Sequence, residues 1–544
     1  MRVNAAAENL QAGPQSDSEE RRNRLLRRVD WRFLLPDPSP RKTFCISDGP
    51  LVESLRLVSE TVVEGWKGER AEGCDLAVAM SPDRKTLAAA LTSLRPGGVL
   101  YSEWRGLARR SALRGRLEDA GFERAGFFRP DLDPSEGNPA AWIPLSEPGA
   151  SRHFYLENRG RSRSAWRRAA RRVVRSASMV RSRWRPSGPL CAWARKPASP
   201  AAAIHGDVAN LVMDRWEGLR LGPKPTGLSA LLLTGGLRSE SKVIVLLFPD
   251  SSSRPAAALK IPRVRESAPA IRKEADVLRS LVERGEHGTP EGIPRFLFLD
   301  EINGVPVLGE TAFSGVPLLA AWTEESYGAL ALKASAWLAD LAANRPLQRP
   351  REPWRDRLVD SVLDRFARSF GPVVDARLLE EARRLLGELP DLPLVCEQRD
   401  FSPWNLLLTP SNDLAVVDWE SAELDGLPGL DLIYFLTNLC FSFDGARRTG
   451  RYRESYRSML DPTSPRGALA RRCLDLYCDR VGLGADSLRP LRILTWLVHS
   501  RAEFDRLQAD HGTALDHEVL RSAVCFQLFD EEIARGAAEA SPRA

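Results

Sequence analysis

The sequence predicts an α/β domain followed by an α+β domain that ends in a long helical stretch. The chain has 544 residues, which is too many for a single hydrophobic core. From residue 42 to about residue 197, short apolar runs alternate with helical patterns. Beyond residue 205 a strand-rich stretch comes first, and from about residue 319 the pattern is mainly helical. These observations predict two domains of different architecture.

Composition and charge narrow the class of protein. Hydrophobic residues make up 43% and charged residues 28%, the balance of a globular protein. The net charge of +6 is small for this length and does not by itself imply nucleic acid, and no nucleic acid is expected because no groove-reading motif accompanies the basic residues. The eight cysteines lack close pairs, which favours reduced thiols over a zinc site or disulfides. Residues 1–28 are polar, and we expect a disordered tail without a signal peptide in a cytoplasmic protein.

The first domain is assigned to residues 29–197. Its clearest part is the buried strand Asp75–Met80, a helix through Leu94, the turn Arg95–Gly98 and a strand that starts at Val99. Further expected elements are a strand at 43–46, a helix over about 107–120 that stops at Gly121, and late strands at 153–157 and 190–194.

Residues 198–204, rich in proline and alanine, are the predicted linker, and residues 205–544 form the second domain. Strands are expected at 230–233, 242–248, 257–261 and 306–310, with a helix over about 269–285. Short apolar runs at 394–396 and 414–417 interrupt the helical part that follows.

The strongest chemical signal is a set of polar residues around the second of these runs. Asp400 and Asn405 lie five residues apart in one loop, and Asp418 and Glu420 follow the apolar run 414–417. Phosphoryl transfer needs a carboxylate that orients and deprotonates the acceptor hydroxyl, and oxygen ligands for a metal on the phosphates. Mg²⁺ favours such a sparse oxygen set. We therefore predict Asp400 as catalytic base and Asn405, Asp418 and Glu420 as metal ligands.

These residues resemble the motifs of the aminoglycoside phosphotransferase and choline kinase-like family. In that family the loop begins with a histidine, two residues before the aspartate, where this chain has Gln398. The segment Gly426–Leu432 is similar to the next landmark of the family, and the resemblance implies that Asp431 steadies the catalytic loop.

The upstream half of the domain adds to the resemblance. Lys260, in an expected strand, is similar to the lysine that holds the nucleotide phosphates, and Glu274 on the following helix is its implied partner. Gly235 and Gly236 lie where a phosphate-covering loop belongs, and Ser239 and Ser241 follow them. The segment around Glu310 and Ala312 resembles the hinge whose backbone binds adenine.

Taken together, the resemblance implies a bilobal protein-kinase-like fold, with an N-lobe over about 205–318 and a C-lobe over about 319–544. It implies ATP and Mg²⁺ as cofactors, and transfer of the γ-phosphoryl group to a hydroxyl of a small molecule such as a sugar, an amino alcohol or a glycan precursor. The acceptor would be chosen by the helices of 320–395 and 435–535. There His499, Arg501, Glu503 and Asp505 either line a pocket or coat a helix.

Two alternatives stay open. Gln398 and the short glycine loop also fit a catalytically weak, nucleotide-binding pseudokinase scaffold. Residues 40–197 resemble a trimmed, Rossmann-like class I S-adenosylmethionine-dependent methyltransferase, on the basis of Asp75–Met80 and Leu94–Leu100. The turn Ser47–Pro50 is a poor glycine loop, so S-adenosylmethionine is not expected as a cofactor, and the methyltransferase domain is expected to be degenerate. The corresponding alternative function is a methyltransferase with an appended kinase-like regulator.

An arginine-rich segment, residues 159–185, has apolar residues at helical spacing and predicts a basic amphipathic helix. One interpretation is a helix that packs on a neighbouring domain. The other is contact with an anionic membrane or a phosphorylated glycolipid.

Overall fold

The structure is a computed structural model that describes residues 14–47, 49–65, 69–104, 109–132, 138–146, 148–156, 189–198, 208–236, 238, 240–283, 290–343, 354–512 and 515–540. The chain divides into two compact units. The strand-rich unit comprises Glu20–Ala275 and Arg295–Val316, and the helix-rich unit comprises Met1–Glu19, Asp276–Pro294 and Pro317–Ala544. Among the described helices, none is long and apolar enough to cross a membrane.

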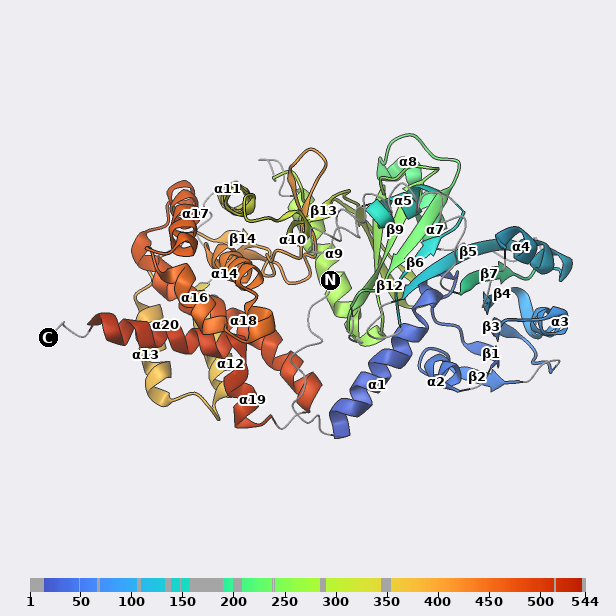
Figure 1. Ribbon diagram of the computed structural model, residues 1–544, viewed down its shortest axis with the longest axis horizontal. Coiled ribbons are helices and arrows are strands. Elements are labelled where there is room, and N and C mark those ends of the chain that lie inside the picture. Colours follow the sequence, from blue (N-terminus) through green and yellow to red (C-terminus); the bar gives the residue numbers. More distant parts are fainter. Residues whose placement is uncertain are drawn as a thin grey trace. The chain divides into compact units, whose positions relative to one another are not determined.

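A single sheet of twelve strands runs through the strand-rich unit, in the order β11-β12-β10-β9-β8-β6-β5-β7-β4-β3-β1-β2 (Figure 1). Its strands are β1 (Lys42–Ile46), β2 (Thr61–Glu64), β3 (Cys74–Met80), β4 (Leu94–Trp104), β5 (Glu123–Leu132), β6 (Pro139–Pro144), β7 (Leu190–Arg195), β8 (Leu228–Leu233), β9 (Lys242–Pro249), β10 (Ala257–Pro262), β11 (Phe296–Ile302) and β12 (Val305–Thr311).

The first strands form a parallel layer, in which β1 lies between β2 and β3, and β4 lies beside β3. Alternate residues of β3 enter different cores: Leu76 and Val78 pack on one face, Ala77 and Ala79 on the other. A parallel strand buried on both faces is apolar throughout, which is why Cys74–Met80 is recognisable from sequence. On the first face Trp31 stacks on Tyr101, with 3.6 Å between ring centroids.

The predicted boundary between two domains at 198–204 is wrong as a division of the fold. Strand β6 pairs antiparallel with β8, with Ala141 opposite Leu233 and Trp142 opposite Leu232, so the sheet continues from one predicted domain into the other. One hydrophobic core extends along it, from Val78 to Leu259. An unpaired edge of β8 would expose backbone groups, and β6 covers it. Most of the linker, residues 199–204, lies outside the described residues.

The helices that accompany this sheet include two departures from expectation. Residues 14–28 form α1 rather than a disordered tail, because Leu26 is buried and Arg28 bonds to Glu103 at 2.7 and 2.9 Å. The predicted late strand at 153–157 is wrong, because Pro148–Leu156 forms α5. Ala150 and Phe154, four residues apart, share its buried face.

The helices and short helical turns that accompany the sheet are α1 (Pro14–Arg28), η1 (Asp30–Leu34), α2 (Pro50–Arg56), α3 (Arg84–Ser93), α4 (Arg110–Asp119), α5 (Pro148–Leu156), α7 (Val208–Met213), α8 (Trp216–Leu219), η3 (Arg265–Ser267) and α9 (Ala268–Glu283).

The helix-rich unit is built around α14, α16, α18 and α20, which contact one another in the orange-to-red part of the chain (Figure 1). Its helical elements are α10 (Leu318–Ala321), α11 (Tyr327–Ala343), η5 (Asp356–Asp360), α12 (Ser361–Phe370), α13 (Ala376–Gly387), α14 (Leu430–Asp444), α15 (Ala446–Thr449), α16 (Tyr452–Leu460), α17 (Pro465–Val481), η6 (Ala485–Ser487), α18 (Leu488–His511), α19 (His517–Ser522) and α20 (Val524–Ala540). Its short strands are β14 (Val395–Glu397) paired with β17 (Glu423–Gly426), and the hairpin β15 (Leu406–Leu408) with β16 (Leu414–Val416). The two-residue strand β13 (Val316–Pro317) lies at the unit boundary.

A fully buried ion pair fastens the N-terminal segment to the later strands of the same unit. Asp30, in η1, accepts hydrogen bonds from Nε and Nη2 of Arg263 at 3.0 to 3.1 Å, and neither side chain is exposed. Arg263 also donates to the carbonyls of Thr234 and Arg238, which flank Gly235 and Gly236. The buried charges of Asp30 and Arg263 are therefore neutralised by each other, although the two residues lie far apart in the sequence.

We predict that Asp30→Ala lowers the free energy of unfolding of the strand-rich unit by about 3–5 kcal/mol, because it leaves a buried guanidinium unpaired. Arg21→Ala, which breaks the exposed pair Arg21–Glu53, serves as the matched control and should cost about 1 kcal/mol or less. Urea titration followed by tryptophan fluorescence measures both. Equal losses in the two variants would contradict this account of the buried pair.

Candidate active site

The strand-rich unit contains a buried cluster of two lysines and two glutamates. Lys260, on β10, lies 2.5 Å from Glu274 of α9 and 2.9 Å from Glu310 of β12. Lys242, at the start of β9, lies 3.0 Å from the second oxygen of Glu274. The side chains of Lys260, Glu274 and Glu310 are 3% exposed or less, so their charges act on one another in a dry environment. The structure thus brings the predicted lysine and glutamate into contact.

The two glutamates of this cluster differ in their ionisation. Burial alone raises the pKa of Glu274, but attraction by Lys260 and Lys242 outweighs it and lowers the pKa to about 2. Burial raises the pKa of Glu310 to about 7, against the attraction of Lys260 and helped by repulsion from Glu274. One oxygen of Glu310 is buried without a hydrogen-bond partner, which agrees with a carboxyl that resists ionisation. With Glu310 protonated, two lysines face one carboxylate, so the cluster keeps a positive charge.

The predicted loop and hinge residues lie in the same unit. Gly235 and Gly236 follow β8, and a Cβ on Gly236 would come within 2.3 Å of Ser241, so the loop needs glycine there. Ser239 lies outside the described residues. The backbone N–H of Ala312 donates to the carbonyl of Ala256 at 3.4 Å. The resemblance implies only a backbone role for the hinge segment that contains Glu310. In the structure the carboxylate of Glu310 also forms an ion pair with Lys260.

We predict that Glu310→Gln flattens the dependence of stability on pH. Folded Glu310 keeps its proton up to about pH 7, whereas the unfolded side chain loses it near its usual value of 4.5, so wild-type stability falls as pH rises through that window. The variant has no proton to lose. Between pH 4.5 and 8 the free energy of unfolding of the variant should therefore rise relative to that of the wild type by roughly 3 kcal/mol, as measured by urea titration.

Glu301→Gln is the matched control for this prediction, because Glu301 forms an exposed pair with Arg272, with both side chains 47% exposed. Its pH profile should follow that of the wild type. A Glu310→Gln profile parallel to the wild type across the window would show that Glu310 ionises normally in the folded chain.

The helix-rich unit holds the loop predicted to be catalytic. The side-chain nitrogen of Asn405 donates to both the carbonyl and the carboxylate of Asp400, at 3.0 and 2.7 Å. Phe401, fully buried, stacks on Trp337 and anchors the loop between these two polar residues. Burial raises the pKa of Asp400 to about 8, with repulsion from Asp418 as the next cause. The loop therefore fixes one carboxylate in a single orientation.

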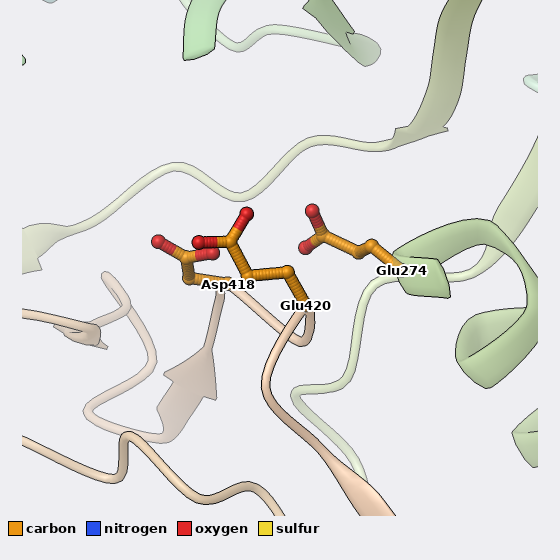
Figure 2. A group of neighbouring side chains, drawn as sticks. All are labelled: Glu274, Asp418 and Glu420. Atoms are coloured by element: carbon orange, nitrogen blue, oxygen red, sulfur yellow. The ribbon is translucent and has the colours of Figure 1, made fainter. Parts of the chain in front are cut away.

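Asp418 and Glu420 lie at the same end of the β15–β16 hairpin as Asn405. The N–H of Val417 donates to the carbonyl of Asn405 at 3.0 Å, which brings the residue before β15 next to the residue after β16. Asp418 has φ of +71°, a conformation that is unusual outside glycine and often found at functional sites. Carboxylate oxygens of Asp418 and Glu420 lie within 4.8 Å of each other, and Figure 2 shows both side chains extending from one loop.

This set of oxygens fits a magnesium ion. Because Asn405 uses its nitrogen to hold Asp400, its side-chain oxygen is the atom left for a cation. Together with Asp418 and Glu420 it makes a small all-oxygen donor set, and Mg²⁺ typically completes such a set with waters and phosphate oxygens.

Gln398 and Asp431 hold the catalytic loop in place. The carboxylate of Asp431 accepts from the N–H groups of Gln398 and Arg399 at 2.6 and 2.8 Å. The side chain of Gln398 accepts from the N–H of Asp400 at 2.8 Å and donates to the carbonyls of Val417, at 3.2 Å, and Asp418. Gln398 therefore links the loop to the strand end that carries Asp418, and the departure from histidine leaves this support complete.

Sequence reasoning missed the contribution of Lys242 and of the carboxylate of Glu310. In the sheet Lys242 is opposite Pro262, and Glu310 is opposite Ala258, so each lies diagonally from Lys260 on a neighbouring strand. The register between strands would have revealed both, but it depends on long-range pairing that a single sequence does not give.

Part of the chain matches a known protein family. Residues 248–467 match the model of the family described as phosphotransferase enzymes, APH. The C-terminal half thus carries a phosphotransferase-family domain. This match confirms that part of the sequence-based resemblance and supports a kinase-like fold there. It does not extend to the N-terminal part, where the resemblance to methyltransferases stays a prediction.

Several solved structures are similar to this phosphotransferase domain. A thermostable mutant of aminoglycoside phosphotransferase APH(4)-Ia is 17% identical, with 61% of this chain and 99% of that chain covered and a TM-score of 0.37. Plasmodium vivax ethanolamine kinase is 12% identical over 56% and 83% of the two chains, with a TM-score of 0.36. Aminoglycoside phosphotransferase APH(3'')-Id from Streptomyces rimosus is 15% identical over 59% and 97%, with a TM-score of 0.30. No curated protein matches the sequence.

The predicted basic helix of residues 159–185 lies outside the described residues, so packing on a domain and contact with an anionic membrane both stay predictions.

Proposed function

We propose that the chain is an ATP- and Mg²⁺-dependent phosphotransferase that moves the γ-phosphoryl group of ATP to a hydroxyl of a small molecule. The family match supports a small-molecule phosphotransferase in general. The observation that carries the proposal further is the pairing of Asp400 with Asn405, beside Asp418 and Glu420 in one unit. Phosphoryl transfer requires this division into a fixed base and a metal-binding oxygen set.

In the proposed reaction the acceptor hydroxyl oxygen attacks the γ-phosphorus while the bond from that phosphorus to the β–γ bridging oxygen breaks. The hydroxyl proton passes to Asp400, and ADP leaves. Asn405 keeps the carboxylate of Asp400 directed at the hydroxyl through its 2.7 Å hydrogen bond. Lys260 orients the nucleotide phosphates, and Glu274 holds Lys260 extended.

Asn405, Asp418 and Glu420 would hold Mg²⁺. When bound, the ion neutralises phosphate charge that would otherwise repel the carboxylates of the site. Glu310, when protonated, leaves the charge of Lys260 available to the phosphates.

We predict that Asp400→Asn lowers kcat for phosphoryl transfer about 10²- to 10⁴-fold, because the amide orients a hydroxyl but accepts no proton. Transfer from radiolabelled ATP to a panel of sugars, amino alcohols and hydroxy acids measures the rate, and calorimetry with ATP confirms that nucleotide binding persists. Asp413→Asn is the matched control, since Asp413 is exposed at the turn of the β15–β16 hairpin, and it should leave the rate unchanged.

Equal, low rates in the wild type and Asp400→Asn, with ATP still bound, would favour the pseudokinase scaffold over the phosphotransferase.

A separate prediction concerns the metal ligands. Asp418→Asn should raise the Mg²⁺ concentration needed for half-maximal transfer by about 10-fold or more, because a charged ligand is replaced by a neutral one. Titration of Mg²⁺ at saturating ATP measures the change. An unaltered requirement would place the metal elsewhere than Asp418.

A further inference from the structure

The catalytic loop contacts an arginine that has no carboxylate partner in the part of the chain that the structure describes. Arg447, on α15, places its guanidinium carbon 4.6 Å from the ring centroid of Trp404, which belongs to the catalytic loop immediately before Asn405. It donates a hydrogen bond to the side-chain oxygen of Asn438, a neutral acceptor. Among the described residues no carboxylate forms an ion pair with Arg447, and its Nε is buried without a hydrogen-bond partner.

A guanidinium group with a buried, unpaired N–H is energetically unfavourable. Burial lowers the pKa of Arg447, and the neighbouring charge of Arg506 acts in the same direction, whereas Asp400 acts against it. A buried donor without a partner costs free energy and calls for an explanation in a folded protein. The planar guanidinium matches the geometry of carboxylate and phosphate groups, and its empty Nε is one of the donors that such a group would use.

Two further side chains near Asp400, those of Tyr434 and His499, offer aromatic ring faces rather than charge. Tyr434 stacks on His499 with 3.6 Å between ring centroids and an angle of 5° between the rings. Burial raises the pKa of Tyr434, with repulsion from Asp400 as the next cause, which identifies the two as neighbours. Burial also lowers the pKa of His499 to about 3, so this ring is neutral at pH 7. Tyr434 and His499 therefore offer no charge to an ion, and of the two alternatives for His499, solvated coating of a helix does not hold.

We propose that Arg447 recognises an oxyanion group, a carboxylate or a phosphate, on the hydroxyl-bearing acceptor. This inference rests on the proposed function and names the acceptor class for the same site. The acceptor would place its anionic group on Arg447 and an apolar surface near Trp404, and its hydroxyl would face Asp400. An ammonium group at the same place would be repelled by the guanidinium.

The test uses four three-carbon hydroxyl compounds that differ in charge: glycerate, glycerol 3-phosphate, glycerol and 2-amino-1,3-propanediol. Calorimetry with the full chain, in the presence of Mg²⁺ and ADP, gives their dissociation constants. We expect at least one anionic compound to bind about 10-fold or more tightly than glycerol and the amino diol. Comparison of glycerate with glycerol 3-phosphate distinguishes a carboxylate from a phosphate.

Arg447→Gln should remove this preference, while Arg448→Gln, an exposed neighbour on the same short helix, should keep it. ATP should bind both variants as it binds the wild type, which also shows that they fold. The inference is overturned if neither anion binds, if the neutral or cationic compound binds best, if Arg447→Gln keeps the preference, or if Arg447→Gln weakens ATP binding instead.

Failure of the inference is distinguishable from failure of the proposed function. If Asp400→Asn transfers phosphate as the wild type does, the phosphotransferase proposal fails whatever the charge of the bound compound. If Asp400→Asn abolishes transfer and only cationic acceptors are used, the phosphotransferase proposal is supported and the proposed role of Arg447 is contradicted.

Discussion

The carboxylate of Asp431 is the constraint on which the candidate site depends. It receives two successive backbone N–H groups, from Gln398 and Arg399, and so fixes the strand end that precedes Asp400. Arg399 has φ of +61°, and this left-handed turn directs the chain into the loop. A buried carboxylate that accepts two N–H groups offsets the backbone strain of such a turn. The positions of Asp400 and Asn405 follow from it.

A second constraint operates in the strand-rich unit. The sheet is continuous across β6 and β8, and Asp30 neutralises Arg263 beside the glycine loop. The residues proposed to bind the nucleotide phosphates therefore lie on a sheet that the N-terminal part stabilises, both through the shared hydrophobic core and through the buried ion pair. The N-terminal part of this unit is therefore needed for the fold, because β6 covers the edge of β8 and Asp30 satisfies a buried cation.

Much of the fold and of the candidate site could be predicted from the sequence, and the parts that could not be predicted have physical reasons. Local signals identified Cys74–Met80, the strand with Lys260 and the spaced set from Asp400 to Asp418, because apolar runs and loop motifs are properties of short segments. The pairing of β6 with β8 and the diagonal approach of Glu310 to Lys260 depend on register between distant strands. The helix α5 was mistaken for a strand, since aromatic residues suit either structure until their neighbours are known.

The glutamine at position 398 changes how the loop responds to its surroundings. Where a histidine supports a loop through its ring nitrogens, protonation in mildly acidic solution converts an acceptor into a donor and alters the support. The amide of Gln398 accepts from Asp400 and donates to Val417 and Asp418 with groups that do not titrate there. The support that Gln398 gives this loop thus keeps the same donors and acceptors in acidic and in neutral solution. Acid sensitivity is left to the carboxylates around the loop, among them Asp431, whose pKa burial raises to about 7.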